Sequence, residues 1–190
     1  MRKQLRALFV AAVIAGPLAV PAHTPAALLH KSIKQNEPKT EKQLIREVHH
    51  VLVMLPYYSV FDNLAYKVEG DKVILEGQVV RPTLKSDAGA AVKGIEGVST
   101  VVNNIEVLPL SPMDVQLRRA VYRAIYGDSV LSRYRYEAVP SIHIIVKNGN
   151  VTLEGVVDNE SDRNLANLRA NEVPNAFSVK NNLRVVSSGK

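Results

Sequence analysis

The chain has 190 residues, 46% of them hydrophobic, and carries 24 Lys and Arg against 18 Asp and Glu for a net charge of +6. This composition is that of a globular protein with one domain or two small ones, and it excludes wholesale disorder and collagen-like structure. The chain has no cysteine, which excludes disulfides, cysteine-ligated zinc, iron–sulfur clusters and a thiol nucleophile.

Residues 1–22 are predicted to be a secretory signal peptide. Three basic residues precede an unbroken apolar run over 7–15, and small residues allow cleavage after Ala22. A membrane anchor is disfavoured, because a spanning helix needs about 20 apolar residues. Export removes three basic residues, so the charge of the exported chain falls from +6 to +3. Part of the basic charge therefore belongs to the predicted signal peptide, and the net charge does not indicate nucleic-acid binding.

Residues 23–39 contain Pro25 and Pro38 and have little periodicity, which predicts a flexible linker. A first folded unit is predicted over 40–108, because helical and strand-like apolar patterns alternate there. Its expected elements, in order, are a helix from a Thr40 cap to Pro56, strands 64–68 and 73–79, a helix from Leu84 to Ile95, and a strand over 98–107.

A second unit is predicted over 113–187, after a short, stiff linker at 109–112. It is expected to begin with a helix that Ser111 caps and Pro112 opens. The remaining elements, in order, are strands 142–146 and 151–157, a helix with apolar residues Leu165, Leu168 and Val173, and a strand over 176–186.

The two units are a tandem repeat. Gly77 and Gly155 close the same Val-x-Leu-Glu-Gly pattern 78 residues apart, and the Asn-Asn pairs that begin at 103 and 181 have the same separation. The first helices align at 73 residues, so the second unit contains five extra residues before its first strand. The predicted fold class is α+β, with two α-β-β-α-β units, each a three-stranded mixed sheet with two helices on one face. Glycine in mid-strand predicts a bulge or a close backbone approach at Gly77 and Gly155.

Both units resemble the BON domain, over residues 40–187. The first unit carries the pattern Gly70-x-x-Val73-x-Leu75-x-Gly77-x-Val79, then Ala91, then Gly97-Val98-x-x-Val101-x-Asn103-x-Ile105. The second retains Val151-x-Leu153-x-Gly155-x-Val157 and Val179-x-Asn181-x-Leu183, and it departs from the family at Asn175 and Ala176, where Gly-Val is usual.

The resemblance implies a periplasmic, non-catalytic protein that associates with phospholipid membranes and maintains the cell envelope. A signal peptide followed by two BON units is also similar to the osmotically inducible periplasmic proteins of Gram-negative bacteria. No cofactor is expected, and the expected partners are an anionic phospholipid surface and envelope proteins rather than nucleic acid.

The sequence contains no clear catalytic or metal-binding pattern. His49 and His50 are adjacent on a helix and diverge by about 100°, so they cannot easily share a metal. His143 is predicted to point outward from a strand, and the histidines are expected to be exposed or to have satisfied hydrogen bonds. Glu76 and Glu154 are equivalent carboxylates, but they belong to different units. We therefore predict that the protein is not an enzyme.

Arginine and tyrosine residues gather early in the second unit, which has a net charge of +2 against −2 for the first. At about 100° per residue, those of the helix fall in one arc opposite its apolar stripe. Guanidinium groups bind phosphate oxygens, and tyrosine favours a lipid–water boundary. The predicted lipid-binding residues are Arg118, Arg119, Tyr122, Arg123, Tyr126, Arg133, Tyr134, Arg135 and Tyr136.

Two other interpretations of this surface remain open. A charged helix face is often only solvated, with salt bridges such as one from Asp114 to Arg118. Alternatively, two small sheets with exposed edge strands would suit a periplasmic chaperone or protein–protein interaction module.

Overall fold

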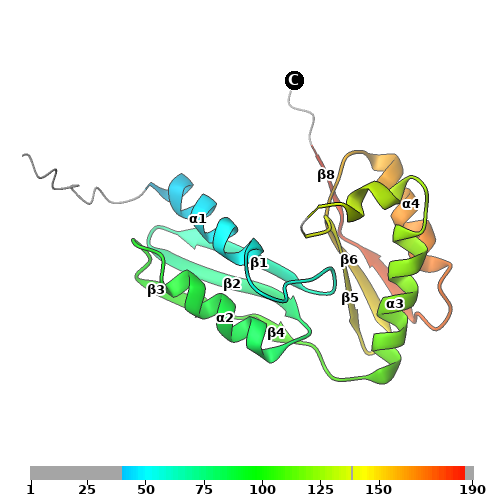
Figure 1. Ribbon diagram of the computed structural model, residues 1–190, viewed down its shortest axis with the longest axis horizontal. Coiled ribbons are helices and arrows are strands. Elements are labelled where there is room, and N and C mark those ends of the chain that lie inside the picture. The colour runs from blue at the N-terminus through cyan, green and yellow to red at the C-terminus, as the bar shows by residue number, and fades with distance from the viewer. Residues whose placement is uncertain (1–39, 138, 187–190) are drawn as a thin grey trace, which may run out of the picture. The chain divides into compact units, whose positions relative to one another are not determined.

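The computed structural model describes residues 40–137 and 139–186, so the predicted signal peptide and linker lie outside the described residues. The first unit has the predicted α-β-β-α-β order (Figure 1). Its elements are α1 (Glu41–Val53), β1 (Asn63–Glu69), β2 (Lys72–Val79), α2 (Pro82–Lys93), and a last strand in two pieces, β3 (Thr100–Asn103) and β4 (Glu106–Val107).

The second unit repeats this order with one addition, a short 3₁₀ helix in the region of the five-residue insertion (Figure 1). Its elements are α3 (Pro112–Tyr126), the 3₁₀ helix η1 (Leu131–Arg135), β5 (Ile142–Lys147), β6 (Asn150–Val157), α4 (Glu160–Asn171), β7 (Ser178–Asn181) and β8 (Arg184–Val185).

Each unit contains a mixed sheet, which confirms the α+β prediction. In the first, β2 pairs antiparallel with β1 and parallel with both β3 and β4. In the second, β6 pairs antiparallel with β5 and parallel with both β7 and β8. In each unit, the hairpin places the first strand beside the middle strand. The following helix, α2 or α4, carries the chain back, so that the last strand runs parallel to the middle strand.

Each unit has its own apolar core between sheet and helices. In α1 the residues Leu44, Val48 and Leu52 are buried, and Leu117, Val121 and Ile125 take the equivalent positions in α3. Their spacing of four residues places them on one helix face, which packs on the sheet. The helix pairs α1 with α2 and α3 with α4 also contact each other.

The last strand of each unit is interrupted at the first asparagine of the repeated Asn-Asn pair. The Asn103 side chain donates to the Lys85 carbonyl at 2.8 Å and accepts from the Ile105 N–H at 3.2 Å. Asn181 does the same with the Arg163 carbonyl and the Leu183 N–H. These bonds divert the chain from the strand ladder and fasten it to the preceding helix, so one predicted strand becomes two.

The two mid-strand glycines confirm the predicted close approach. Gly77 has φ +110° and Gly155 has φ +116°, a backbone conformation that favours glycine. A Cβ atom at Gly77 would lie 2.1 Å from the Asn63 carbonyl oxygen, and one at Gly155 would lie 2.0 Å from the Ser141 oxygen. Any side chain here would separate the two strands of the hairpin.

The apolar face predicted for the last helix is partly wrong. Leu168 is 53% exposed, whereas Ala166 and Ala170 are buried. Asp162 is buried at the position equivalent to Leu84 of the first unit. A carboxylate thus replaces a leucine at the edge of the core, and its hydrogen-bond partners are Tyr134 and Arg133 of η1 and the side chain of Asn159, the N-cap of α4.

Candidate functional site

Helix α3 and the adjoining η1 contain eight of the nine predicted lipid-binding residues, and the ninth, Tyr136, follows as the C-cap of η1. The helix begins where the Ser111 hydroxyl accepts the Asp114 N–H at 3.2 Å and Pro112 occupies the first turn. It ends at Gly127. The helical wheel placed five of the residues opposite the core, and the structure separates these five into buried and exposed groups.

Arg118 does not lie on the outer surface, which corrects the prediction. It is only 4% exposed, and its Nη2 donates to the Val146 carbonyl on β5 at 2.8 Å. Burial lowers the pKa of Arg118, while the nearby Asp114 carboxylate acts in the opposite direction. The flank of α3 beside β5 is covered by the sheet, so this guanidinium cannot reach a headgroup.

Tyr126 is also buried rather than exposed. Its hydroxyl donates to the Ile142 carbonyl at 2.5 Å, and burial raises the pKa of the phenol. Helix η1 packs against α3 and adds a covered side that the helical wheel could not include. Tyr126 is therefore part of the core.

Tyr134 and Arg133 serve a buried hydrogen-bond cluster around Asp162. The Tyr134 hydroxyl donates to the Asp162 carboxylate at 2.5 Å and accepts the Asp158 N–H at 2.9 Å. Arg133 pairs with the carboxylates of Asp162 and Asp158. Tyr134 is buried and the Arg133 charge is already paired, so these two predicted contacts are structural.

Four of the nine residues are exposed and have no carboxylate partner among the described residues. Arg119 and Arg123 lie one turn apart on the outer face of α3. Arg135 lies over the ring of Tyr136, with 5.4 Å from its Cζ to the ring centroid. Tyr122 is half-buried, and its ring packs against that of Tyr126 with the ring centroids 4.9 Å apart. The surface that remains available for an anionic partner comprises Arg119, Arg123, Arg135 and Tyr136.

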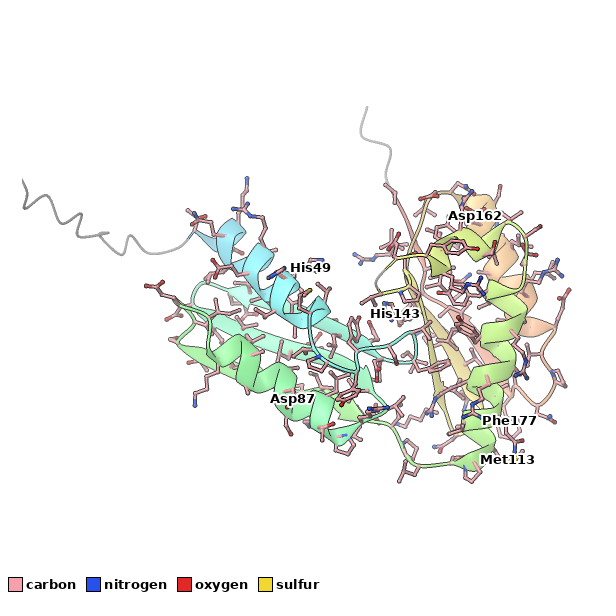
Figure 2. All side chains as sticks on the ribbon, in the orientation of Figure 1. His49, Asp87, Met113, His143, Asp162 and Phe177 are labelled. Carbon is pink, nitrogen blue, oxygen red and sulfur yellow. The ribbon has the colours of Figure 1, made fainter. Side chains whose placement is uncertain are left out.

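Arg119 and Arg123 border a half-open groove of about 750 Å³. Met113, which is 63% exposed, and Phe177, which is 82% exposed, also line this groove. Figure 2 places these two labelled side chains at the same end of α3. The lining consists of Ser111, Met113, Asp114, Gln116, Leu117, Arg119, Ala120, Arg123, Asn148, Gly149, Pro174, Asn175 and Phe177.

Asp114 has a role that the sequence did not indicate. The expected Asp114–Arg118 salt bridge is absent from the described residues. Instead, the buried Asp114 carboxylate accepts the N–H groups of Asn148 and Gly149 at 3.0 and 2.8 Å. It ties the start of α3 to the turn between β5 and β6, which supports one end of the groove.

His143 is buried on β5, in contrast to the outward orientation that was predicted. Its ring stacks on Tyr58 of the first unit, with the centroids 5.6 Å apart, and its Nδ1 has no hydrogen-bond partner among the described residues. In the part of the chain that the structure describes, no three His, Asp or Glu side chains gather closely enough to hold a metal ion. No helix described is long and apolar enough to cross a membrane.

Residues 54–109 and 114–187 match the family described as the BON domain. No curated protein matches the chain. Among solved structures, the chain is similar to CdsD, a structural protein of the type III secretion system of Chlamydia trachomatis. The identity is 13% over 76% of this chain and 92% of that one, with a TM-score of 0.31. The CdsD C-terminal domain gives 13% identity over 78% and 100%, also with a TM-score of 0.31. These structural likenesses are too low to support an argument about function.

Proposed function

The chain belongs to the BON family of non-catalytic, membrane-associated domains, and from this premise we propose that it is an exported protein that associates with anionic phospholipid surfaces. One observation carries the proposal. Arg119 and Arg123 project from one face of α3 with no carboxylate partner among the described residues. Two such guanidinium groups suit phosphate oxygens.

The proposed location is the periplasm, and the proposed role is envelope maintenance or protection during osmotic stress. Residues 1–22 begin with basic residues, continue with an apolar run and end with small residues, and this order supports export. The family supports the envelope role. No specific observation favours the chaperone alternative, which needs a free strand edge. On β5, the Ile144 N–H already donates to the Val60 carbonyl at 2.8 Å.

Charge reversal at Arg119→Glu and Arg123→Glu should abolish binding to anionic liposomes. Each basic side chain near an anionic surface contributes about 1 kcal/mol, so loss of two should weaken binding by at least about thirtyfold. Co-sedimentation of the chain from residue 23, which contains every described residue, would be compared on anionic and zwitterionic liposomes. Binding of the unaltered chain to anionic liposomes should weaken at high salt, because exposed charges are screened.

The matched control is Lys42→Glu with Arg46→Glu on α1. These residues are also exposed and four positions apart, so the change in net charge and helix spacing is the same. The control should retain liposome binding. Equal loss in both double variants would refute a specific surface on α3. Suppression of client aggregation without any lipid affinity would instead favour the chaperone interpretation.

A further inference from the structure

The groove beside α3 is lined by side chains that differ from their counterparts in the first unit. Phe177 occupies the position equivalent to Ser99, and Gly149 the position equivalent to Asp71. The backbone bond between them is the same in both units, at 2.8 Å from the Phe177 N–H to the Gly149 carbonyl and 2.9 Å from the Ser99 N–H to the Asp71 carbonyl. The difference between the units thus lies in the side chains.

Gly149 allows the Phe177 ring to lie across the β5–β6 turn. A Cβ atom at Gly149 would come within 2.7 Å of the ring, so most residues at this position would displace it. The adjacent Ala176 is smaller than its counterpart Val98, and Ala120 stands where the first unit has Glu47. Phe177 thus gives the groove an apolar wall, and Ala120 places no acidic group there.

The groove has opposite chemical character at its two ends. Met113 and Phe177 provide apolar surface at one end. Toward the other end, Arg119 and Arg123 provide positive charge that has no carboxylate partner among the described residues. Ten residues separate Met113 from Arg123, which is about 15 Å along a helix and close to the length of an extended dodecyl chain. Asp114 lies near the apolar end, and its carboxylate is occupied by the two N–H groups of the turn.

We propose that this groove binds one single-chain anionic amphiphile as a monomer, such as a fatty carboxylate. The head group pairs with Arg119 and Arg123, and the chain lies against Ala120, Met113 and Phe177. A volume of about 750 Å³ is within the range of small-molecule sites, roughly 300–1,000 Å³. The inference rests on the proposed function insofar as both use the same two arginines, but it concerns a free ligand rather than a membrane surface.

The test is calorimetric titration of the chain from residue 23 with dodecanoate below its critical micelle concentration. Two variants restore residues of the first unit, Phe177→Ser and Ala120→Glu. Phe177 is largely exposed, so its replacement should not unfold the protein, and circular dichroism would check this. We expect each variant to weaken dodecanoate binding by about tenfold or more, because apolar contact is lost or a like charge is introduced. Phe177→Ser should leave salt-sensitive liposome binding within about twofold.

The outcomes separate this inference from the proposed function. Dodecanoate binding that depends on Phe177, without any liposome binding, would support the groove and refute membrane association. Liposome binding without dodecanoate binding would overturn the groove. Equal binding of a neutral decyl maltoside would overturn the requirement for a negative head group. Capture of an acidic apolar peptide in place of dodecanoate would also overturn the inference.

Discussion

At the scale of single residues, His143 is a titratable group that the fold buries. Burial lowers the pKa of His143, while Asp62 and two nearby backbone carbonyls act in the opposite direction. The ring lies against Tyr58, whose own pKa burial raises to about 12, so that the phenol stays neutral. The folded protein therefore contains a neutral imidazole at neutral pH.

This environment predicts that acid destabilises the fold. In the unfolded chain a histidine takes up its proton near pH 6.5, whereas in the folded chain it does so only at lower pH. The unfolded state thus binds more protons as the pH falls through 6.5, and the free energy of unfolding falls with it. Urea unfolding at pH 7.5 and pH 5 should show this loss, and His143→Phe, which retains a ring against Tyr58, should reduce it.

His50→Gln is the control for this experiment, because His50 is exposed on α1. It should leave the difference between the two pH values unchanged. A His143→Phe variant with the same pH dependence as the unaltered chain would show that the fold does not exclude the protonated imidazole.

At the scale of elements, the insertion before β5 and the carboxylate on α4 belong together. Where the first unit has Leu84 in its core, the second has Asp162, and η1 provides Tyr134 and Arg133 as its partners. The insertion therefore supplies hydrogen bonds that the leucine did not need. A buried carboxylate without these partners would be strongly destabilising.

Tyr134→Phe should lower the free energy of unfolding by about 1–3 kcal/mol, because the Asp162 carboxylate and the Asp158 N–H each lose a partner. Urea denaturation would measure the change. Tyr136→Phe removes a hydroxyl from an exposed ring two residues away and should change the stability by no more than about 0.5 kcal/mol. Similar losses in the two variants would contradict a structural role for the insertion.

The sequence predicts the repeated elements well because their apolar spacing is strong, as Leu44, Val48 and Leu52 illustrate. It predicts the exposed site less well. A helical wheel describes one apolar stripe, whereas α3 also contacts β5 through Arg118 and Tyr126. The buried cluster could have been predicted from the repeat, because Asp162 occupies the position of the apolar Leu84. The turn bonds of Asp114 had no such signal, because their partners lie more than 30 residues away.

At the scale of the molecule, the segment between α1 and β1 contributes to the core of the second unit. The Val60 side chain is buried among the residues of that core, and its carbonyl accepts the Ile144 N–H at 2.8 Å. The ring of Phe61 meets that of Tyr122 with the centroids 6.0 Å apart. An amide on β5 is thereby protected by residues that precede β1 in the chain.

Val60→Asp should therefore expose β5 although the substituted residue lies in the first unit. A buried carboxylate with no partner costs several kcal/mol, which favours release of the segment from the second unit. Hydrogen exchange at the Ile144 amide should then accelerate by at least about tenfold, since exchange reports local opening. Tyr57→Asn provides the control in the same segment, because Tyr57 is exposed and its φ of 67° suits asparagine. If Ile144 exchanged at the same rate in Val60→Asp as in the control, the second unit would hold this strand edge without help from the first.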